Sequence, residues 1–370
     1  MSATGLGVEP FELMIVSRGR GRGHAVPDMA IAATLTILLP NLHLQFVSYA
    51  SGADAYRACG YEVLDLHQPD NPPFLDMVIA FTRLLARVKP DLVVVHEEIP
   101  ALPAAKAFEI PCIFVTDFFL DPSSLPMRAL ECANEIVFTA QSGLFTEPPY
   151  LKGKVHYVGR AVRQMEYAIA DRDRARRELG IPRDAMVVLC QPGGWVESVV
   201  PLATLLSSAW NLLPYSSKRL IWLAGRDCGT LSAQFHQADD ILIWKEDLKI
   251  DRLMAASNVL ITKANRLTVY EAAAMGLPSI SVSKFVNWPD DVAVANVESN
   301  TPVYGDSLTP EALSNLIVEK ACSKPRPATD HSGGIANAAA RIADRIRELG
   351  RPACATRRSA AGRRAELCER

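Results

Sequence analysis

The chain has 370 residues, more than one domain of ordinary size contains, and this length predicts two domains. Hydrophobic residues make up 49% and charged residues 22%, and the formal net charge at pH 7 is -2; this composition indicates a globular protein and excludes an overall basic field for nucleic acid. The 8 cysteines include no C-x-x-C pair, which argues against a zinc site and a disulfide framework and is typical of a reducing compartment.

Strands alternate with helices along the first part of the chain. Its first ten residues lack the basic and apolar regions of a signal peptide, and no apolar run is long enough to span a membrane, so we expect a cytoplasmic protein. Apolar runs and periodicity predict strands over 11–17, 42–49, 61–66, 91–96, 111–118 and 135–140, and helices over 25–39, 74–88 and 101–108. This alternation predicts a parallel sheet with helices on both faces.

The pattern restarts after a seam near residues 155–163. We predict a strand within 175–194, strands over 219–225, 241–244, 259–262 and 279–283, and helices over 202–213, 251–257, 267–276 and 333–350. The sequence therefore predicts an α/β protein of two Rossmann-like domains, 11–158 and 159–350, that face each other across a cleft, with ligands at the carboxyl ends of the strands. The Arg- and Ala-rich segment 351–370 is expected to be a disordered tail.

A glycine-rich loop follows the first strand, with Gly19, Gly21 and Gly23 in the spacing G-x-G-x-G. The dinucleotide-binding fingerprint needs G-x-G-x-x-G and an acidic residue that closes the second strand, and the phosphate-binding P-loop needs G-K-[ST]. Neither pattern is present, which disfavours a bound NAD. The glycines would let the backbone approach a ligand closely, and the start of the next helix favours negative charge.

His24 stands at the entry of that helix and is the candidate general base, because imidazole titrates near neutral pH. Asp117, at the carboxyl end of the strand 111–118, is the candidate acid that orients it. Each residue has a structural alternative: His24 could cap or pack against the helix, and Asp117 could cap the turn that follows it.

The second half carries the segment "ITKANRLTVYEAAAMGLPSISV", a strand, a polar turn, a helix and a second strand. Lys263, Asn265, Arg266 and the first helical N–H groups form a predicted anion site. Glu271, one turn inside the helix, could accept two ribose hydroxyls. It could equally be the capping-box partner of Thr268, since the two stand three residues apart.

This segment, together with "GRGHAVPDMAIA" in the first half, resembles the GT-B glycosyltransferases and within them the family 28 group, which includes the peptidoglycan N-acetylglucosaminyltransferase that forms lipid II. The similarity covers residues 11 to about 345. The resemblance implies a nucleotide-sugar donor held mainly by the C-terminal domain and an acceptor held mainly by the N-terminal domain. Enzymes of this kind need neither a metal ion nor another cofactor.

The resemblance also implies roles for single residues. Glu271 would hold the donor ribose, His24 would act as base or acceptor contact, and Gly193 and Gly194 would form the glycine turn that opens the second domain. The diphosphate turn would consist of Lys263, Asn265, Arg266, Leu267 and Thr268. The chain departs from the family pattern at Asn265–Arg266, where relatives have a small Gly-x pair, and at Asp290 and Asp291, which stand near the place of a His-Gln or Asp-Gln pair and are candidate contacts to the donor sugar.

We therefore predict a cytoplasmic, inverting, metal-independent glycosyltransferase that uses a nucleotide-diphosphate sugar, with UDP as the expected nucleotide. His24, oriented by Asp117, would deprotonate the acceptor hydroxyl. An acidic acceptor or the donor phosphates would meet the loop residues Arg18, Arg20, Gly21, Arg22 and Gly23. The expected partners are the donor and an unidentified acceptor, without nucleic acid, for a monomer or weak homodimer.

Other functions on this fold stay open. A sugar-nucleotide hydrolase or 2-epimerase would use the same two domains, and a non-catalytic sugar-nucleotide-binding protein would use the donor site alone. The helix 74–88 combines an apolar face with Arg83, Arg87 and Lys89. We expect that face to pack on the core, with peripheral contact at the inner face of the membrane as the alternative.

Overall fold

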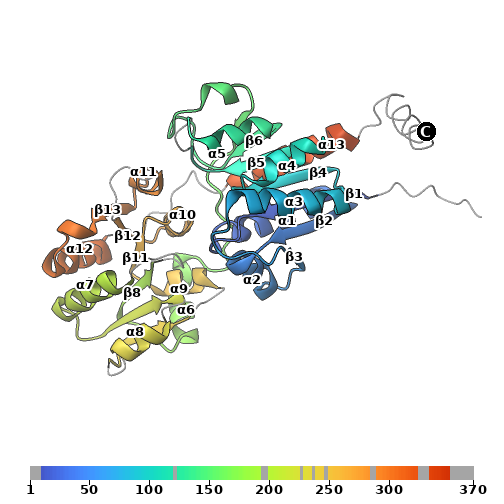
Figure 1. The fold of residues 1–370 in the computed structure, drawn as a ribbon. Coiled ribbons are helices and arrows are strands. Elements are labelled where there is room, and N and C mark those ends of the chain that lie inside the picture. The colour runs from blue at the N-terminus through green and yellow to red at the C-terminus, as the bar shows by residue number, and fades with distance from the viewer. Residues whose placement is uncertain are drawn as a thin grey trace, which may run out of the picture.

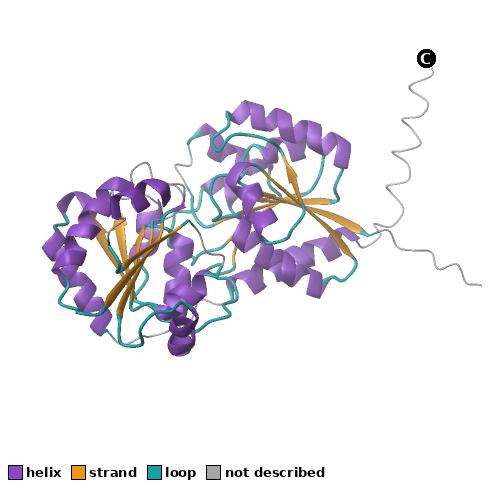
Figure 2. Ribbon diagram, turned by 90° about the horizontal axis from the view of Figure 1, so that it is seen from below, coloured by secondary structure: helices purple, strands orange, loops and turns teal. Residues whose placement is uncertain are grey.

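The protein consists of two α/β units, each built around its own parallel sheet with helices on both faces (Figures 1 and 2). The structure is a computed structural model. It describes residues 10–119, 123–192, 199–225, 228–235, 238–245, 249–283, 289–323 and 333–350. The predicted tail 351–370 lies outside these residues.

The N-terminal sheet has seven strands in the order β3-β2-β1-β4-β5-β6-β7, all paired in parallel. Its strands are β1 Phe11–Ser17, β2 Leu42–Ser48, β3 Val63–Asp65, β4 Leu92–His96, β5 Cys112–Thr116, β6 Glu135–Phe138 and β7 Val155–Tyr157. Every residue of β4, β5 and β6 is buried, as expected for the centre of a sheet covered on both faces. The connecting helices are α1 Ala25–Leu38, α2 Ala50–Ala58, α3 Phe74–Val88, α4 Ala101–Ala107 and α5 Leu125–Arg128.

The C-terminal sheet has six strands in the order β10-β9-β8-β11-β12-β13, again all parallel. Its strands are β8 Met186–Gln191, β9 Lys218–Leu223, β10 Ile241–Trp244, β11 Val259–Lys263, β12 Ser279–Ser283 and β13 Asn300–Tyr304. Its helices are α6 Arg172–Glu178, α7 Val199–Leu212, α8 Cys228–Phe235, α9 Ile250–Ala256, α10 Arg266–Met275, α11 Pro289–Ala295 and α12 Pro310–Cys322. Both sheets therefore have the Rossmann strand order. In each sheet, the direction in which successive strands are added reverses between the first and the fourth strand, which is the place where ligands bind in such sheets.

The last described helix, α13 Gly334–Gly350, returns to the N-terminal sheet and packs against α1 (Figure 1). Its buried face joins the core of β1 and α1, Arg341 Nε donates to Glu135 at 2.8 Å, and Asn337 Nδ2 donates to the carbonyl of Val158 at 3.0 Å. We predicted that the C-terminal domain extends to residue 350, but α13 belongs by its packing to the N-terminal domain. The apolar stripe of α13 indicates that it packs on something, but it carries no information on which sheet it covers.

Helix α3 packs on the N-terminal core, as the sequence predicts. Met77, Phe81, Leu84 and Leu85 are buried in that core, whereas Phe74, Leu75 and Ile79 are exposed on the other side. In the part of the chain that the structure describes, no helix is both long and apolar enough to cross a membrane.

Candidate functional site

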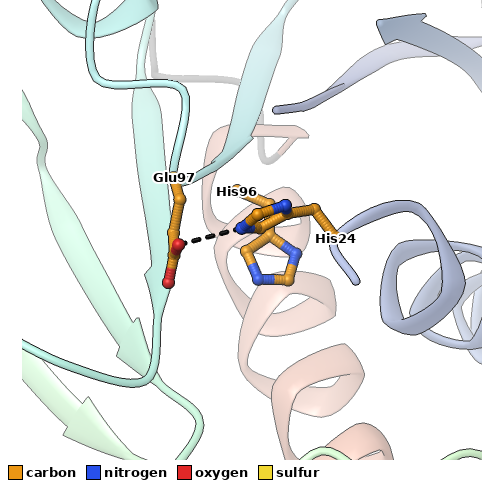
Figure 3. Close-up of side chains that lie close together, drawn as sticks. All are labelled: His24, His96 and Glu97. Atoms are coloured by element: carbon orange, nitrogen blue, oxygen red, sulfur yellow. Dashed lines mark hydrogen bonds and ion pairs between the residues drawn. The ribbon is translucent and has the colours of Figure 1, made fainter. Parts of the chain in front are cut away.

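The candidate site lies at the reversal point of the N-terminal sheet. Strands β1 and β4 are neighbours, with Ser17 paired to His96, so the segments that follow them leave the same edge of the sheet. His24 lies at the entry of α1 after β1, whereas His96 ends β4 and Glu97 follows directly. The three side chains meet there although 72 or more residues of sequence separate His24 from the other two (Figure 3).

His24 and Glu97 form a hydrogen-bonded pair. His24 Nε2 stands 2.8 Å from Glu97 Oε2, and the hydroxyl of Thr116 donates to Glu97 Oε1 at 3.1 Å. Because an ionised carboxylate only accepts, Nε2 carries the proton and Nδ1 keeps its lone pair. Nδ1 is buried and has no hydrogen-bond partner in the described part of the chain. The arrangement therefore presents Nδ1 as a proton acceptor, with the tautomer set by Glu97.

Electrostatics keep this pair in the states that a general base needs. Burial lowers the pKa of His24, and this outweighs the opposite influence of its hydrogen bond to Glu97. Burial by itself would raise the pKa of Glu97, but the hydrogen bond with His24 and the nearby Arg266 hold it well below its usual range. At neutral pH the site thus combines a neutral imidazole with an ionised carboxylate.

A second histidine–carboxylate pair lies directly beside the first. His96 Nδ1 donates to Asp28 Oδ1 at 2.8 Å, and Ser17, which also contacts the Tyr56 hydroxyl, donates to the other carboxylate oxygen of Asp28. Burial by itself would lower the pKa of His96, but Asp28 and other nearby carboxylates raise it to about 9. The rings of His24 and His96 stand edge to face with centroids 4.9 Å apart.

Ligand atoms of His24, His96 and Glu97 lie within 4.8 Å of one another, a grouping that could hold a metal ion. Two ligands on a tetrahedral zinc ion would stand roughly 3.3 Å apart, given metal–ligand bonds of about 2 Å. His24 and Glu97 approach to 2.8 Å, which is hydrogen-bond distance, and His96 already uses Nδ1 for Asp28. The geometry therefore favours two proton-sharing pairs over a set of metal ligands.

The glycine loop packs against the protein itself more than it opens toward a ligand. A Cβ at Gly19 would stand 2.5 Å from the carbonyl oxygen of Tyr49, and Gly52 N donates to Gly19 at 2.9 Å. Gly21 has a φ of 76° and donates to Ser51 Oγ at 2.9 Å. Gly23 is exposed and could approach a ligand closely, as expected for this loop, whereas Gly19 is buried against Tyr49 and could not. Of the predicted arginines, Arg18, Arg20 and Arg22 are all half-buried.

On the C-terminal side, α10 begins at Arg266 with Asn265 as its N-cap residue, whose side chain accepts from Thr268 N at 3.4 Å. Thr268 is therefore not the N-cap, and the capping-box alternative for Glu271 is wrong. Arg266 forms an ion pair with Asp117, and its guanidinium lies 4.5 Å from the centroid of the Phe118 ring. The predicted orienting acid is thus held by Arg266 of the predicted diphosphate turn, and Glu97 takes the place beside His24 that we expected for Asp117.

Glu271 is almost fully buried and is held by Arg163, whose Nε stands 2.7 Å from Glu271 Oε1. Arg163 belongs to the segment between β7 and α6 that joins the two sheets. Burial raises the pKa of Glu271 despite the opposing charge of Arg163. The residue predicted to bind the ribose is therefore buried and paired with a guanidinium of the connecting segment.

A small cavity of about 40 Å³ joins the two sides. His96, Asp117 and Thr139 line it from the N-terminal domain, and Leu267 and Tyr270 line it from α10.

Among the residues that the structure describes, the others predicted to contact the donor do not line this cavity. Lys263 ends β11 and is half-buried, and Asp291 is buried and bonded to Ser283. Gly193, Gly194 and the side chain of Asp290 lie outside the described part of the structure.

Sequence reasoning missed three residues of the site: Asp28, His96 and Glu97. A usable signal was present, because "HEE" follows directly after an apolar strand. In the Rossmann strand order, the fourth strand lies beside the first. The carboxyl end of β4 is therefore the nearest place for a partner of His24, which follows β1. Asp117 follows β5, one strand further away.

No family model matches the chain. Curated proteins similar in sequence include two glycosyltransferases. An uncharacterized glycosyltransferase of Methanopyrus kandleri is 27% identical over 230 residues, a match that covers 58% of this chain and 63% of that protein, less than two thirds of its length. The UDP-N-acetylglucosamine--N-acetylmuramyl-(pentapeptide) pyrophosphoryl-undecaprenol N-acetylglucosamine transferase of Mycobacterium ulcerans is 27% identical over 403 aligned positions, which cover 98% of both chains.

Solved structures share the fold. MurG of Acinetobacter baumannii matches with a TM-score of 0.62 and 14% identity over 92% of this chain and 100% of that chain. A putative UDP-N-acetylglucosamine 2-epimerase of Listeria monocytogenes matches with a TM-score of 0.67 and 13% identity over 91% and 96%. These likenesses confirm the predicted GT-B arrangement of two Rossmann-like domains, and the sequence relatives confirm the predicted similarity to glycosyltransferases.

Proposed function

We propose that this protein is an inverting glycosyltransferase that moves a sugar from a nucleotide-diphosphate donor, with UDP as the nucleotide, to an acceptor hydroxyl. The observation that carries the proposal is the His24–Glu97 pair, which presents a neutral, oriented base. The residues next to this pair in sequence, Gly23 and His96, line a cavity that α10 lines from the other side. Sequence similarity to a UDP-N-acetylglucosamine-dependent transferase over 98% of the chain supports the same reading.

In this mechanism His24 Nδ1 accepts the proton of the acceptor hydroxyl. Glu97 fixes the tautomer through Nε2 and stabilises the imidazolium that forms. The hydroxyl oxygen then attacks the anomeric carbon from the face opposite the leaving diphosphate, which inverts the configuration. An acceptor hydroxyl bonded to Nδ1 also supplies the partner that this buried atom lacks among the described residues.

The donor occupies the C-terminal side. Lys263, Arg266 and the first N–H groups of α10 stabilise the charge of the departing diphosphate, so the reaction needs no metal ion. Glu271 accepts the ribose hydroxyls. Because Arg266 is paired with Asp117 and Glu271 with Arg163, donor binding requires both contacts to rearrange, and the domains must open before they close on substrate.

A thermal-shift panel of UDP, GDP, dTDP and their common sugars, on wild type and Glu271→Ala, tests the donor assignment. We expect stabilisation by UDP compounds that Glu271→Ala removes. Glu166→Ala is the matched control, because Glu166 is an exposed carboxylate of the same domain that pairs with Lys249. Absence of a shift with every nucleotide would contradict the proposal.

A 2-epimerase is the second candidate, because the matched 2-epimerase structure has a TM-score of 0.67, against 0.62 for the matched MurG. Such fold similarity does not separate the two activities. Incubation of the protein with UDP-N-acetylglucosamine alone does separate them. An epimerase forms the C2 epimer and a hydrolase releases free sugar, whereas a transferase leaves the donor essentially intact until an acceptor is added.

We also propose that the protein works in the cytoplasm, with α3 as the part that contacts a membrane. Phe74, Leu75 and Ile79 expose apolar side chains on this helix, and Arg83 and Arg87 add positive charge. Sedimentation with vesicles that contain anionic phospholipid should carry the wild type down, and the triple change of these apolar residues to serine should abolish this. Equal sedimentation of both proteins would exclude α3 as the contact.

A further inference from the structure

His96 is a buried titratable group that the mechanism above does not use. Its side chain ends β4 and is almost inaccessible to solvent, and its Nδ1 donates to Asp28 at 2.8 Å. Asp28 is held in turn by Ser17, and Ser17 by Tyr56. This chain of contacts fixes the imidazole ring and leaves Nε2 as the ring nitrogen that can bind another group.

The cavity between the domains brings hydrogen-bond donors together from both sides. His96 lines it from the N-terminal sheet, and Leu267, the second residue of α10, lines it from the C-terminal domain. The first N–H groups of an α-helix have no partner within the helix. A group that enters this cavity therefore meets an imidazole N–H on one side and a helix N-terminus on the other, which suits an anionic oxygen.

We infer that His96 binds the diphosphate of the donor from the N-terminal domain, as a hydrogen-bond donor that Asp28 holds in position. This inference rests on the proposed function and extends it, because the diphosphate is then held between both domains instead of by the C-terminal turn alone. The contact strengthens as negative charge develops on the leaving diphosphate, and it forms only when the domains are closed.

The charges around His96 support this role. Burial opposes the protonated form of His96, but Asp28, Glu97 and Asp117 favour it and raise the pKa of His96 to about 9. The charge of His96 in turn contributes to the lowered pKa of the neighbouring His24. Asp117, which lines the same cavity, forms an ion pair with Arg266 that donor binding must break, so its carboxylate opposes the diphosphate while the His96 imidazolium attracts it. At neutral pH the protonated His96, a hydrogen-bond donor, thus stands beside the neutral His24, a base. Opposite shifts of two pKa values allow one site to supply both kinds of group.

Calorimetric titration of UDP and uridine tests the inference on wild type, His96→Gln and the matched control His43→Gln, whose side chain is exposed on β2. At pH 7 we expect His96→Gln to weaken UDP binding roughly 10- to 100-fold, the loss of one charge-assisted hydrogen bond, and to leave uridine binding unchanged. The control should bind both ligands as the wild type does.

Asp28→Asn provides the second variant in case His96→Gln does not fold. The affinity of wild type for UDP should fall between pH 7 and pH 9.5 as His96 loses its proton, and in Asp28→Asn this fall should begin at a lower pH. Equal losses of UDP and uridine affinity in His96→Gln, or a pH dependence that Asp28→Asn does not move, would overturn the inference alone. Failure of the wild type to bind UDP at any pH would overturn the proposed function together with it.

Discussion

On the N-terminal side of the cavity, His24, Glu97, His96 and Asp28 find their partners within one domain, through hydrogen bonds of 2.8 Å. On the C-terminal side, Arg266 is paired with Asp117 of the other domain, and Glu271 with Arg163 of the connecting segment. The first set does not depend on how the domains are arranged, whereas the second does.

Under the proposed function, the two sides have different tasks. A base must keep its tautomer and protonation state while substrates come and go, and a network anchored on adjacent strands of one sheet can do so. Donor groups must exchange partners when the nucleotide arrives. The ion pair of Arg266 with Asp117 across the domain boundary makes donor binding and domain opening a single coupled step.

Removal of the base should have the largest effect. His24→Ala is expected to lower kcat of sugar transfer roughly 10²- to 10⁴-fold, because no other described group accepts the acceptor proton at that place. The dissociation constant for UDP should change little, since His24 is proposed to contact the acceptor hydroxyl and not the donor. Single-turnover assays and UDP titrations on the same preparation measure both. Unchanged turnover would remove His24 from the chemistry and with it the proposed division of tasks.

The His96–Asp28 pair should make stability depend on pH in a defined direction. Because the pKa of His96 in the folded protein is raised to about 9, its stabilising contribution is fully present below the unfolded value of about 6.5 and is lost as pH rises through 9. The full contribution is roughly 3 kcal/mol. Urea unfolding at pH 6 and pH 9.5 should show a loss of free energy of unfolding in wild type that is smaller in Asp28→Asn. A loss of the same size in both would argue against a charged pair.

Glu97→Gln should reduce transfer roughly 10- to 100-fold, because an amide can donate to His24 Nε2 and so place the proton on Nδ1. Glu98→Gln is the matched control: Glu98 is the next residue, bonds to Tyr49 at 2.9 Å, and burial raises its pKa to about 7. Its amide variant should keep wild-type activity. If the two variants behave alike, the effect lies in the packing of this segment and not in the orientation of His24.

Asp117→Asn should have the smallest effect, and it should strengthen a function of the protein where the other changes weaken one. Release of Arg266 from its ion pair should strengthen UDP binding roughly 3- to 10-fold, since the diphosphate no longer competes with a carboxylate. Transfer at saturating donor should stay near the wild-type rate. A fall in kcat like that of Glu97→Gln would instead support the sequence-based hypothesis that Asp117 orients His24.

Much of the architecture could be read from local pattern. The strand 11–17, the helix 74–88 and the strand 279–283 appear with the predicted bounds, because apolar runs and a helical period report burial directly. The helix 50–58 was not predicted, since Gly52 and its polar neighbours give it little helical signal, yet Gly52 is needed there to approach Gly19.

The sequence by itself determined where strands and helices form, that two Rossmann-like sheets follow one another, and which turns carry chemical groups, because these depend on residues close together in the chain. Only the tertiary structure decided that Glu97 and not Asp117 contacts His24, that Arg163 covers Glu271, and that α13 packs on the N-terminal domain. Those partners lie far apart in sequence, and strand order and the packing of the two domains bring them together.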